Sequence, residues 1–235
     1  MRLAACGHRG NAAGRLPPRE QETLADEHRI VDLEHPERPQ DFGRARGDGL
    51  PYTVKPVNIG KGEQFKPEFL KISPNNRIPA IIDSEGPGGQ PISIFESGAI
   101  LIYLGEKTGK FWPKGDMRHQ VPVLEWLMWQ MGGFGPMPGQ VHHFLQVANE
   151  QDRRYGLERY MKETHRLYGV FDKRLGEAPY AAGNDVSIAD FAILGWAWRH
   201  ERHQVDLADY PNVKRWYEAM MARPGTKRGF EVALS

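Results

Sequence analysis

The sequence predicts an α/β unit followed by an all-helical region. Two short apolar segments, 78–83 and 92–95, flank a turn rich in Gly and Pro, which is typical of a β-hairpin. A helical pattern begins at Ser97 directly after the second segment, and from residue 116 onward apolar residues recur at helical spacing. These observations predict a strand-turn-strand-helix unit in front of a helical domain.

The composition is that of an ordinary globular chain with balanced charge. The chain has 235 residues, of which 40% are hydrophobic, and its 31 basic and 30 acidic residues give a net charge of +1. This balance provides no field for nucleic acid or an anionic membrane, and no stretch approaches the ~18 apolar residues of a membrane helix. The single cysteine, Cys6, cannot form an internal disulfide, so we interpret it as an incidental thiol. We therefore expect a cytoplasmic protein with a small-molecule partner.

Residues 1–49 form an atypical leader. The segment is rich in Arg, Gly and Pro, its one aromatic residue is Phe42, and its apolar residues show almost no periodicity. Such a composition lacks the apolar surface that offsets the entropy cost of ordering. We expect no packed element here, and we place an α/β domain at 50–110 and a helical domain at 116–235.

The α/β domain opens with a segment of strand composition, Tyr52–Ile59. Pro56 has no N–H to donate, so the segment is expected at an edge of the sheet or as an irregular strand. The helix predicted over 97–107 stops near Gly109. Its apolar face is formed by Ile100, Leu101 and Leu104.

Helical periodicity marks several segments after the linker at 110–115. The first helix is bent or broken by the Gly- and Pro-rich run 132–139. A second apolar stripe extends from Leu157 to Leu175. A final helix begins at Pro211.

The segment 189–198 is apolar nearly all round, so we expect a buried central helix. Ser187 and Asp190 have the spacing of a capping box, in which a hydroxyl and a carboxylate each accept a hydrogen bond from a backbone N–H of the first turn.

Two motifs identify a family. Ser73-Pro-Asn-Asn-Arg-Ile-Pro-Ala-Ile81 and Phe95-Glu-Ser-Gly-Ala-Ile100 resemble the glutathione site of the glutathione transferases. In that family an Ile-Pro or Val-Pro step opens the third strand and Glu-Ser opens the next helix. Further motifs are similar to the bacterial nu-class branch, which acts on disulfides and peroxides: Gly60–Phe65, Pro136–Gln140, His142–Phe144 and Gly183–Asp190.

The resemblance covers Gly49 to Ser235. It implies a thioredoxin-like N-terminal domain, a helical C-terminal domain and a two-fold homodimer. It also implies a glutathione transferase or glutathione-dependent disulfide oxidoreductase, with glutathione as cosubstrate and a small electrophile, peroxide or disulfide as partner.

The resemblance assigns binding roles to residues of these motifs. Ser97 at a helix start offers a hydroxyl and amides to the γ-glutamyl carboxylate, and Glu96 can pair with the ammonium. Ile78 would offer its backbone to the cysteinyl part, which requires a cis Ile78-Pro79 bond. Gln64 would contact the backbone of glutathione, and Arg159 its carboxylate. Taken alone, Ser97 reads as an ordinary helix cap, and Gln64 and Arg159 as exposed polar side chains.

His142 and His143 are not expected to bind a metal. Adjacent helix residues point about 100° apart and cannot share an ion. We expect the pair to line the open side of the site or a dimer contact, and we expect no metal site.

The catalytic residue cannot be assigned. A free thiol with a pKa near ~8.5 is mostly protonated at neutral pH, so a donor must stabilise the glutathione thiolate. In the nu-class pattern this donor lies in a Thr-Pro-Asn-Gly turn. This chain has His35-Pro-Glu-Arg38 in the corresponding place.

A shifted reading frame accounts for the departure. Read one nucleotide later, the degenerate codons of Leu33 to Gly49 permit Trp-Ser-Thr-Pro-Asn-Gly-Arg-Lys-Ile-Ser-Val-Ala-Leu-Glu-Glu-Met-Gly, the family turn followed by an amphipathic helix. For the chain as given, we expect a sheet without its first strand and helix. A catalytically impaired glutathione-fold binding or regulatory protein is then the alternative function, and a product that barely folds is a third possibility.

Overall fold

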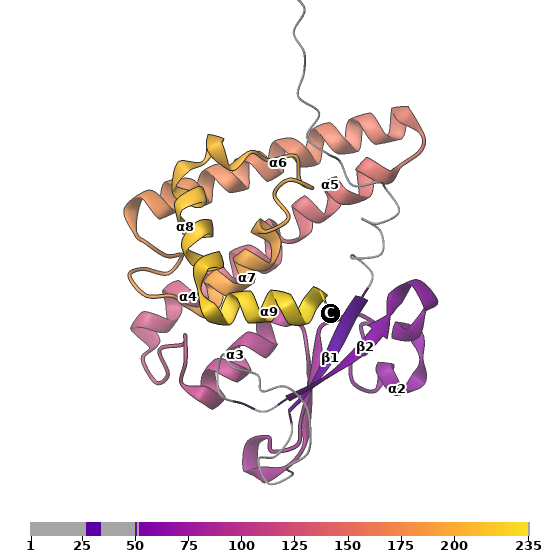
Figure 1. Cartoon of the computed structure of the whole chain (residues 1–235), viewed down its shortest axis with the longest axis vertical. Helices are drawn as coiled ribbons and strands as arrows, with labels where there is room; N and C mark the ends of the chain where they lie inside the picture. The colour runs from indigo at the N-terminus through magenta and orange to yellow at the C-terminus, as the bar shows by residue number, and fades with distance from the viewer. Residues whose placement is uncertain (1–26, 34–49, 51, 235) are drawn as a thin grey trace, which may run out of the picture.

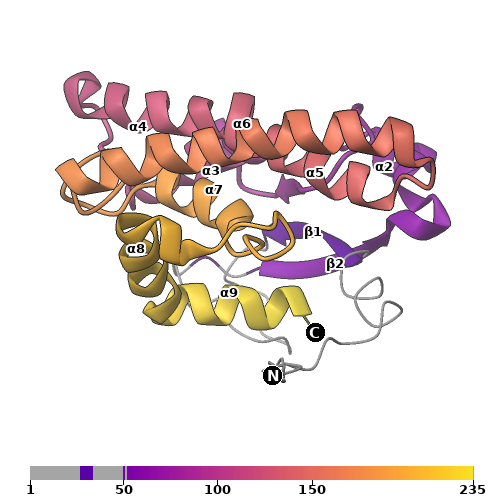
Figure 2. The ribbon, with the colours of Figure 1, turned by 90° about the horizontal axis from the view of Figure 1, so that it is seen from above.

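The computed structural model describes residues 27–33, 50 and 52–234. It has a small α/β part and a larger helical part, which lie on opposite sides of α3 (Figures 1 and 2). No helix of these described residues is long and apolar enough to cross a membrane.

The sheet has four strands in the order β2-β1-β3-β4. They are β1 (Glu27–Leu33), β2 (Tyr52–Asn58), β3 (Ala80–Asp83) and β4 (Ile92–Phe95). Strand β1 pairs antiparallel with β2 and parallel with β3, and β3 pairs antiparallel with β4. Strand β2 lies at the edge of the sheet, which confirms the position that Pro56 predicts.

Strand β1 corrects one expectation. The leader was expected to contain no packed element, and the sheet was expected to lack its first strand. Instead, residues Glu27–Leu33 pair with strands on both sides. The expected absence of a first helix concerns the segment between β1 and β2, which lies outside the described residues.

Short helical elements connect the strands. After β2 come η1 (Ile59–Lys61), η2 (Glu63–Phe65) and α2 (Pro67–Leu70), and the hairpin turn contains η3 (Pro87–Gly89). Helix α3 (Ser97–Thr108) follows β4 and ends at Gly109, whose φ of +67° suits glycine. The predicted hairpin and helix are confirmed.

The helical part consists of α4 (Met117–Trp129), the π-helix η4 (Gln130–Phe134), α5 (Pro136–Gln146), α6 (Glu150–Glu177), α7 (Ile188–Ala197), η5 (Leu207–Asp209), α8 (Pro211–Ala222) and α9 (Pro224–Leu234). Its aromatic core includes Phe134, Tyr168, Phe171 and Trp216, all fully buried. Helix α7 lies inside this core, as its composition predicts, and its Ser187–Asp190 capping box is present.

Helix α3 holds the two parts together. On one side Ile100 packs with Ile81 of the sheet. On the other side Leu101 and Ile102 pack against the helical core. The N-terminus of α3 therefore lies where the α/β part meets the helical part.

Candidate functional site

The register of the hairpin brings the two family motifs together. Ala80 pairs with Phe95 across the antiparallel strands. Ile78 precedes Ala80 by two residues and Glu96 directly follows Phe95. Both residues therefore lie at the same end of the β3–β4 strand pair. Predicted site residues from two separate motifs thus meet at one place.

The loop before β3 presents the backbone of Ile78. The Ile78-Pro79 bond is cis, as the resemblance implies. Buried Ser73 donates a hydrogen bond from Oγ to the carbonyl oxygen of Arg77 at 2.7 Å, and so fixes the residue before Ile78. Among the described residues, the N–H and C=O of Ile78 have no hydrogen-bond partner. This leaves a short edge of backbone free to pair with an extended peptide.

Glu96 makes the turn from β4 into α3 in an unusual conformation. Its φ of +69° is rare for a residue with a side chain and is commonest at functional sites. Its exposed carboxylate accepts a hydrogen bond from Asn75 Nδ2 at 3.4 Å. No side chain of the described ranges caps the first turn of α3. The amides of that turn, with the positive end of the helix dipole, form an anion site.

Ser97 begins α3 and faces the helical part of the molecule. Its Oγ lies 3.6 Å from the sulfur of Met131, in the π-helix η4. The sequence analysis did not identify this partner. The contact spans 34 residues, so no local signal could have found it.

Gln64 lies in η2, next to a carboxylate that holds this loop. Oε2 of Glu63 accepts the Asn58 N–H at 2.8 Å, which lowers the pKa of Glu63, and Lys66 pairs with its other oxygen. The Oε1 atom of Gln64 is buried and has no hydrogen-bond partner among the described residues. A buried acceptor without a partner suits a ligand N–H.

The same region packs beside the cis peptide. Val57 and Phe69 form a small apolar cluster that includes Ile78 at its border. The η1–α2 segment and the start of β3 are thereby fixed to each other.

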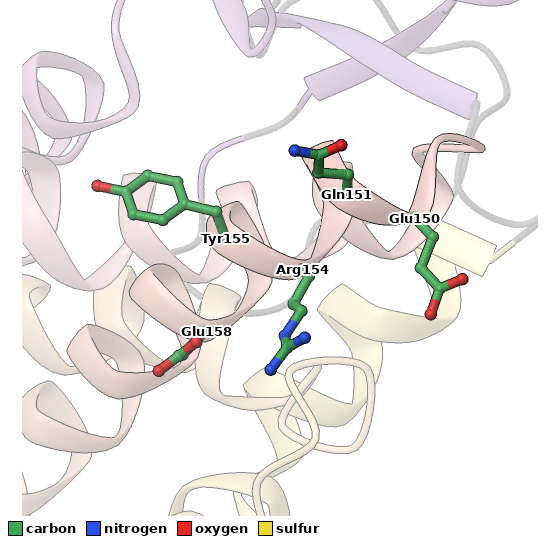
Figure 3. Close-up of a pocket in the computed structure, with 5 residues that line it drawn as sticks. All are labelled: Glu150, Gln151, Arg154, Tyr155 and Glu158. Carbon is green, nitrogen blue, oxygen red and sulfur yellow. The ribbon is translucent and has the colours of Figure 1, made fainter.

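Arg159 is exposed on α6, and within the described residues it has no hydrogen bond or ion pair. The same helix lines a hollow of about 520 Å³. Figure 3 shows its lining side chains along the first half of α6, with Arg154 and Gln151 pointing to opposite sides. No contact places Arg159 beside Ile78 or Ser97, so its binding role stays a prediction.

The two adjacent histidines differ in burial: His142 is half-buried and His143 is exposed. His142 stacks on His203 in the helical part, with ring centroids 4.8 Å apart, and its buried Nε2 has no hydrogen-bond partner in the part of the chain that the structure describes. The expectation that the pair lines the open side of the site or a dimer contact stays a prediction. Within 27–33, 50 and 52–234 there is no group of three or more His, Cys, Asp or Glu residues that could hold a metal.

Comparison with protein families assigns both parts of the chain. The glutathione S-transferase N-terminal domain model matches residues 47–106, and the C-terminal domain model matches residues 136–224. The chain belongs to the glutathione S-transferase family.

Two comparisons place it more closely within the glutathione S-transferases. The disulfide-bond oxidoreductase YfcG of Escherichia coli (strain K12) is 52% identical over 178 residues, which cover 75% of this chain and 82% of YfcG. A glutathione transferase family member from Pseudomonas fluorescens pf-5, solved with two glutathione molecules bound, is 37% identical with a TM-score of 0.72. The match covers 87% of this chain and 93% of the Pseudomonas fluorescens chain.

A third similar protein is Ure2p. Ure2p in complex with glutathione is 31% identical with a TM-score of 0.71, and the match covers 86% of this chain and 98% of that one.

Proposed function

We propose that this glutathione transferase binds glutathione where β3 begins and β4 ends, and uses it to reduce small disulfides. Peroxides and small electrophiles are the other substrate classes that we propose. The carrying observation is the pairing of Ala80 with Phe95, because it puts Ile78 and Glu96-Ser97 at one edge of the sheet. Several groups with unused hydrogen-bonding capacity occur in this region, as a peptide ligand requires.

Each part of glutathione has a matching group. The γ-glutamyl carboxylate would accept from the Ser97 hydroxyl and the first-turn amides of α3, while Glu96 pairs with the ammonium. The cysteinyl backbone would pair with the N–H and C=O of Ile78, which have no partner among the described residues. The buried Oε1 of Gln64 would accept a ligand N–H. Arg159 would pair with a carboxylate of the ligand, within a cleft between the two domains.

The reaction that follows is thiol–disulfide exchange. The glutathione thiolate attacks one sulfur of the disulfide, the S–S bond breaks, and the displaced thiolate takes up a proton. A second glutathione thiolate attacks the mixed disulfide, which yields glutathione disulfide and the second thiol. Two glutathione molecules are oxidised for each disulfide reduced, and no protein cysteine takes part. The Pseudomonas fluorescens relative was solved with two glutathione molecules bound, which supports a reaction that uses two of them.

A specific observation favours binding without turnover as a second candidate. Strand β1 runs parallel to β3 and ends at Leu33 beside Asp83, at the edge of the sheet away from Ile78. A donor that directly follows β1 in this pairing would therefore lie at the opposite end of the strands from Ile78, too far away to reach the thiol of glutathione. We further propose that the segment before Leu50 carries a shifted reading frame, and that the intact frame supplies the thiol-activating turn.

We also propose a homodimer that works in the cytoplasm. Helix α4 exposes an apolar stripe of Met117, Val121 and Met128, whose exposed fractions are 66%, 42% and 49%. Their spacing of four and seven residues puts them on one face, and a contiguous apolar face suits a subunit contact. The cytoplasm keeps thiols reduced, which this chemistry requires.

Ser97→Ala tests the site, with Ser93→Ala as the matched control. Ser93 lies in β4 on the same chain segment but is exposed and away from the edge that carries Ile78. We expect Ser97→Ala to weaken glutathione binding in calorimetry by tenfold or more, roughly the worth of one charge-assisted hydrogen bond. Ser93→Ala should bind as the wild type does. Equal affinity of all three proteins would refute the site.

Glutathione-dependent reduction of 2-hydroxyethyl disulfide separates the two candidates. An enzyme binds glutathione and shows a rate. The second candidate is retained on glutathione resin and shows no rate above the uncatalysed exchange.

A further inference from the structure

A methionine lies directly against the anion-binding end of α3. Met131 belongs to the π-helix η4 between α4 and α5 and is half-buried. Single π-helical turns within helices occur frequently at functional sites. Here the turn carries the Met131 side chain from the helical part to the junction with the sheet.

The thioether covers the first turn of α3 closely. Its sulfur is 3.6 Å from Ser97 Oγ. At Gly98, an added Cβ would come within 3.3 Å of Met131 Cγ and 3.4 Å of its sulfur and Cε. Gly98 therefore allows the Met131 side chain to lie along the backbone of this turn.

The sulfur occupies the position of an acceptor for the Ser97 hydroxyl. A thioether is only a weak acceptor, so a ligand carboxylate displaces it at small cost. A sulfoxide oxygen at the same position would be strongly polar. It would accept the Ser97 hydrogen bond and compete with the carboxylate for the first turn of α3.

We propose that Met131 is a redox modification site whose oxidation to the sulfoxide weakens glutathione binding. This inference rests on the proposed glutathione function of the same site. The oxidant is a hydroperoxide, one of the proposed substrate classes. The sulfur lone pair attacks the distal peroxide oxygen, the O–O bond breaks, and the sulfur keeps that oxygen. The other oxygen of hydrogen peroxide takes up the proton and leaves as water, and methionine sulfoxide reductase reduces the sulfoxide back to the thioether.

The test measures glutathione affinity by calorimetry before and after hydrogen peroxide, in full-length protein with Cys6→Ser in every variant. Peptide mass spectrometry records the sulfoxide at Met131. Met131→Leu keeps an apolar side chain of similar size that cannot be oxidised. Met128→Leu is the matched control, because Met128 lies one turn earlier and is more open to solvent, at 49% exposure. Met131→Gln places a permanent polar acceptor at the site without any oxidant.

We expect oxidation to weaken binding by roughly tenfold in the wild type and in Met128→Leu, and sulfoxide reductases A and B to restore it. Met131→Leu should keep its affinity through the same treatment, and Met131→Gln should bind weakly from the start. An equal loss in Met131→Leu, or no sulfoxide at Met131, would overturn the inference while leaving the glutathione site intact. Failure of the unoxidised wild type to bind glutathione would overturn the proposed function, and this inference with it.

Discussion

The Nζ atom of Lys107 lies 2.5 Å from Oδ2 of Asp83 and so joins the last turn of α3 to the end of β3. Asp83 is 2% exposed and also accepts hydrogen bonds from the Tyr103 hydroxyl and the Glu85 N–H. Burial acts to raise the pKa of Asp83, but the hydrogen bonds from Lys107 and Tyr103 hold it below its ordinary value. This contact fixes α3, and with it the anion site at the other end of the helix.

Asp83→Asn should lower the free energy of unfolding by about 1–3 kcal/mol, because it leaves the Tyr103 hydroxyl and the Lys107 ammonium without their charged partner. Urea unfolding measures the change. Glu163→Gln is the control, since Glu163 pairs with Arg166 on the surface of α6 and should cost less than about 1 kcal/mol. Equal effects of the two substitutions would contradict the structural role of Asp83.

Stability should fall as the pH drops below about 6.5, the ordinary pKa of histidine. Burial, helped by Arg202 and Arg199, lowers the pKa of His142 to about 4, and burial lowers that of His203 to about 3. The unfolded chain therefore binds protons at a higher pH than the folded chain does. Stability is fully present above the unfolded pKa and is lost on the way down to pH 3–4.

His142→Phe tests this assignment. The phenyl ring keeps the stack on His203 but cannot take up a proton, so Tm should fall less steeply between pH 7 and pH 4. His143→Phe, on the exposed neighbour, should leave the slope unchanged. If the slopes of both variants match the wild type, the buried pair is not responsible.

Gly156→Ala should strongly destabilise the contact between α5 and α6. A Cβ at this position would lie 2.1 Å from Cε1 of Phe144, a ring that also stacks on Tyr160. Overpacking of this kind costs roughly 1–3 kcal/mol. Gly169 is the matched control on the same helix, because a Cβ there meets no atom within 4 Å.

Gly169→Ala should instead stabilise the protein by roughly 0.5–1 kcal/mol through helix propensity. Opposite signs in thermal and urea unfolding are expected. A stabilising effect of Gly156→Ala would show that the α5–α6 contact is looser than described.

Restoring the shifted frame should restore catalysis. The variant replaces Leu33–Gly49 by the string that begins Trp-Ser-Thr-Pro-Asn-Gly. In this variant β1 has to reverse and run antiparallel to β3, because only then does the turn that follows β1 lie beside Ile78. With that pairing, we expect its glutathione-dependent disulfide reduction to exceed that of the original chain by tenfold or more, because a hydroxyl donor stabilises the thiolate. Replacing the Thr of the turn by Val is the control and should abolish the gain. DNA sequencing that finds no single-base change restoring the turn would refute the frameshift.

Local signals predicted much of the fold. The Gly- and Pro-rich turn fixed the β3–β4 hairpin, Pro56 indicated an edge strand, and Ser187 with Asp190 marked the start of α7. Each of these depends on residues close together in the chain. The Ile78 and Glu96 motifs lie near each other because a short hairpin connects them.

Features that depend on distant pairing were not predicted. Strand β1 is held by pairing with β2 and β3 and has no strong strand pattern of its own. The stacking of His142 on His203 joins residues far apart in the chain. The contact of Met131 with Ser97 likewise spans 34 residues.

The hairpin that joins the two halves of the proposed glutathione site has its turn at the far end. Gly88 and Gly89 lie in that turn, and a Cβ on either would meet no atom within 4 Å. The strands thus separate the tip from Ile78 and Glu96 by their full length. A fluorophore, an affinity tag or a surface linker could be inserted there, so that binding is observed from a position that the ligand never touches.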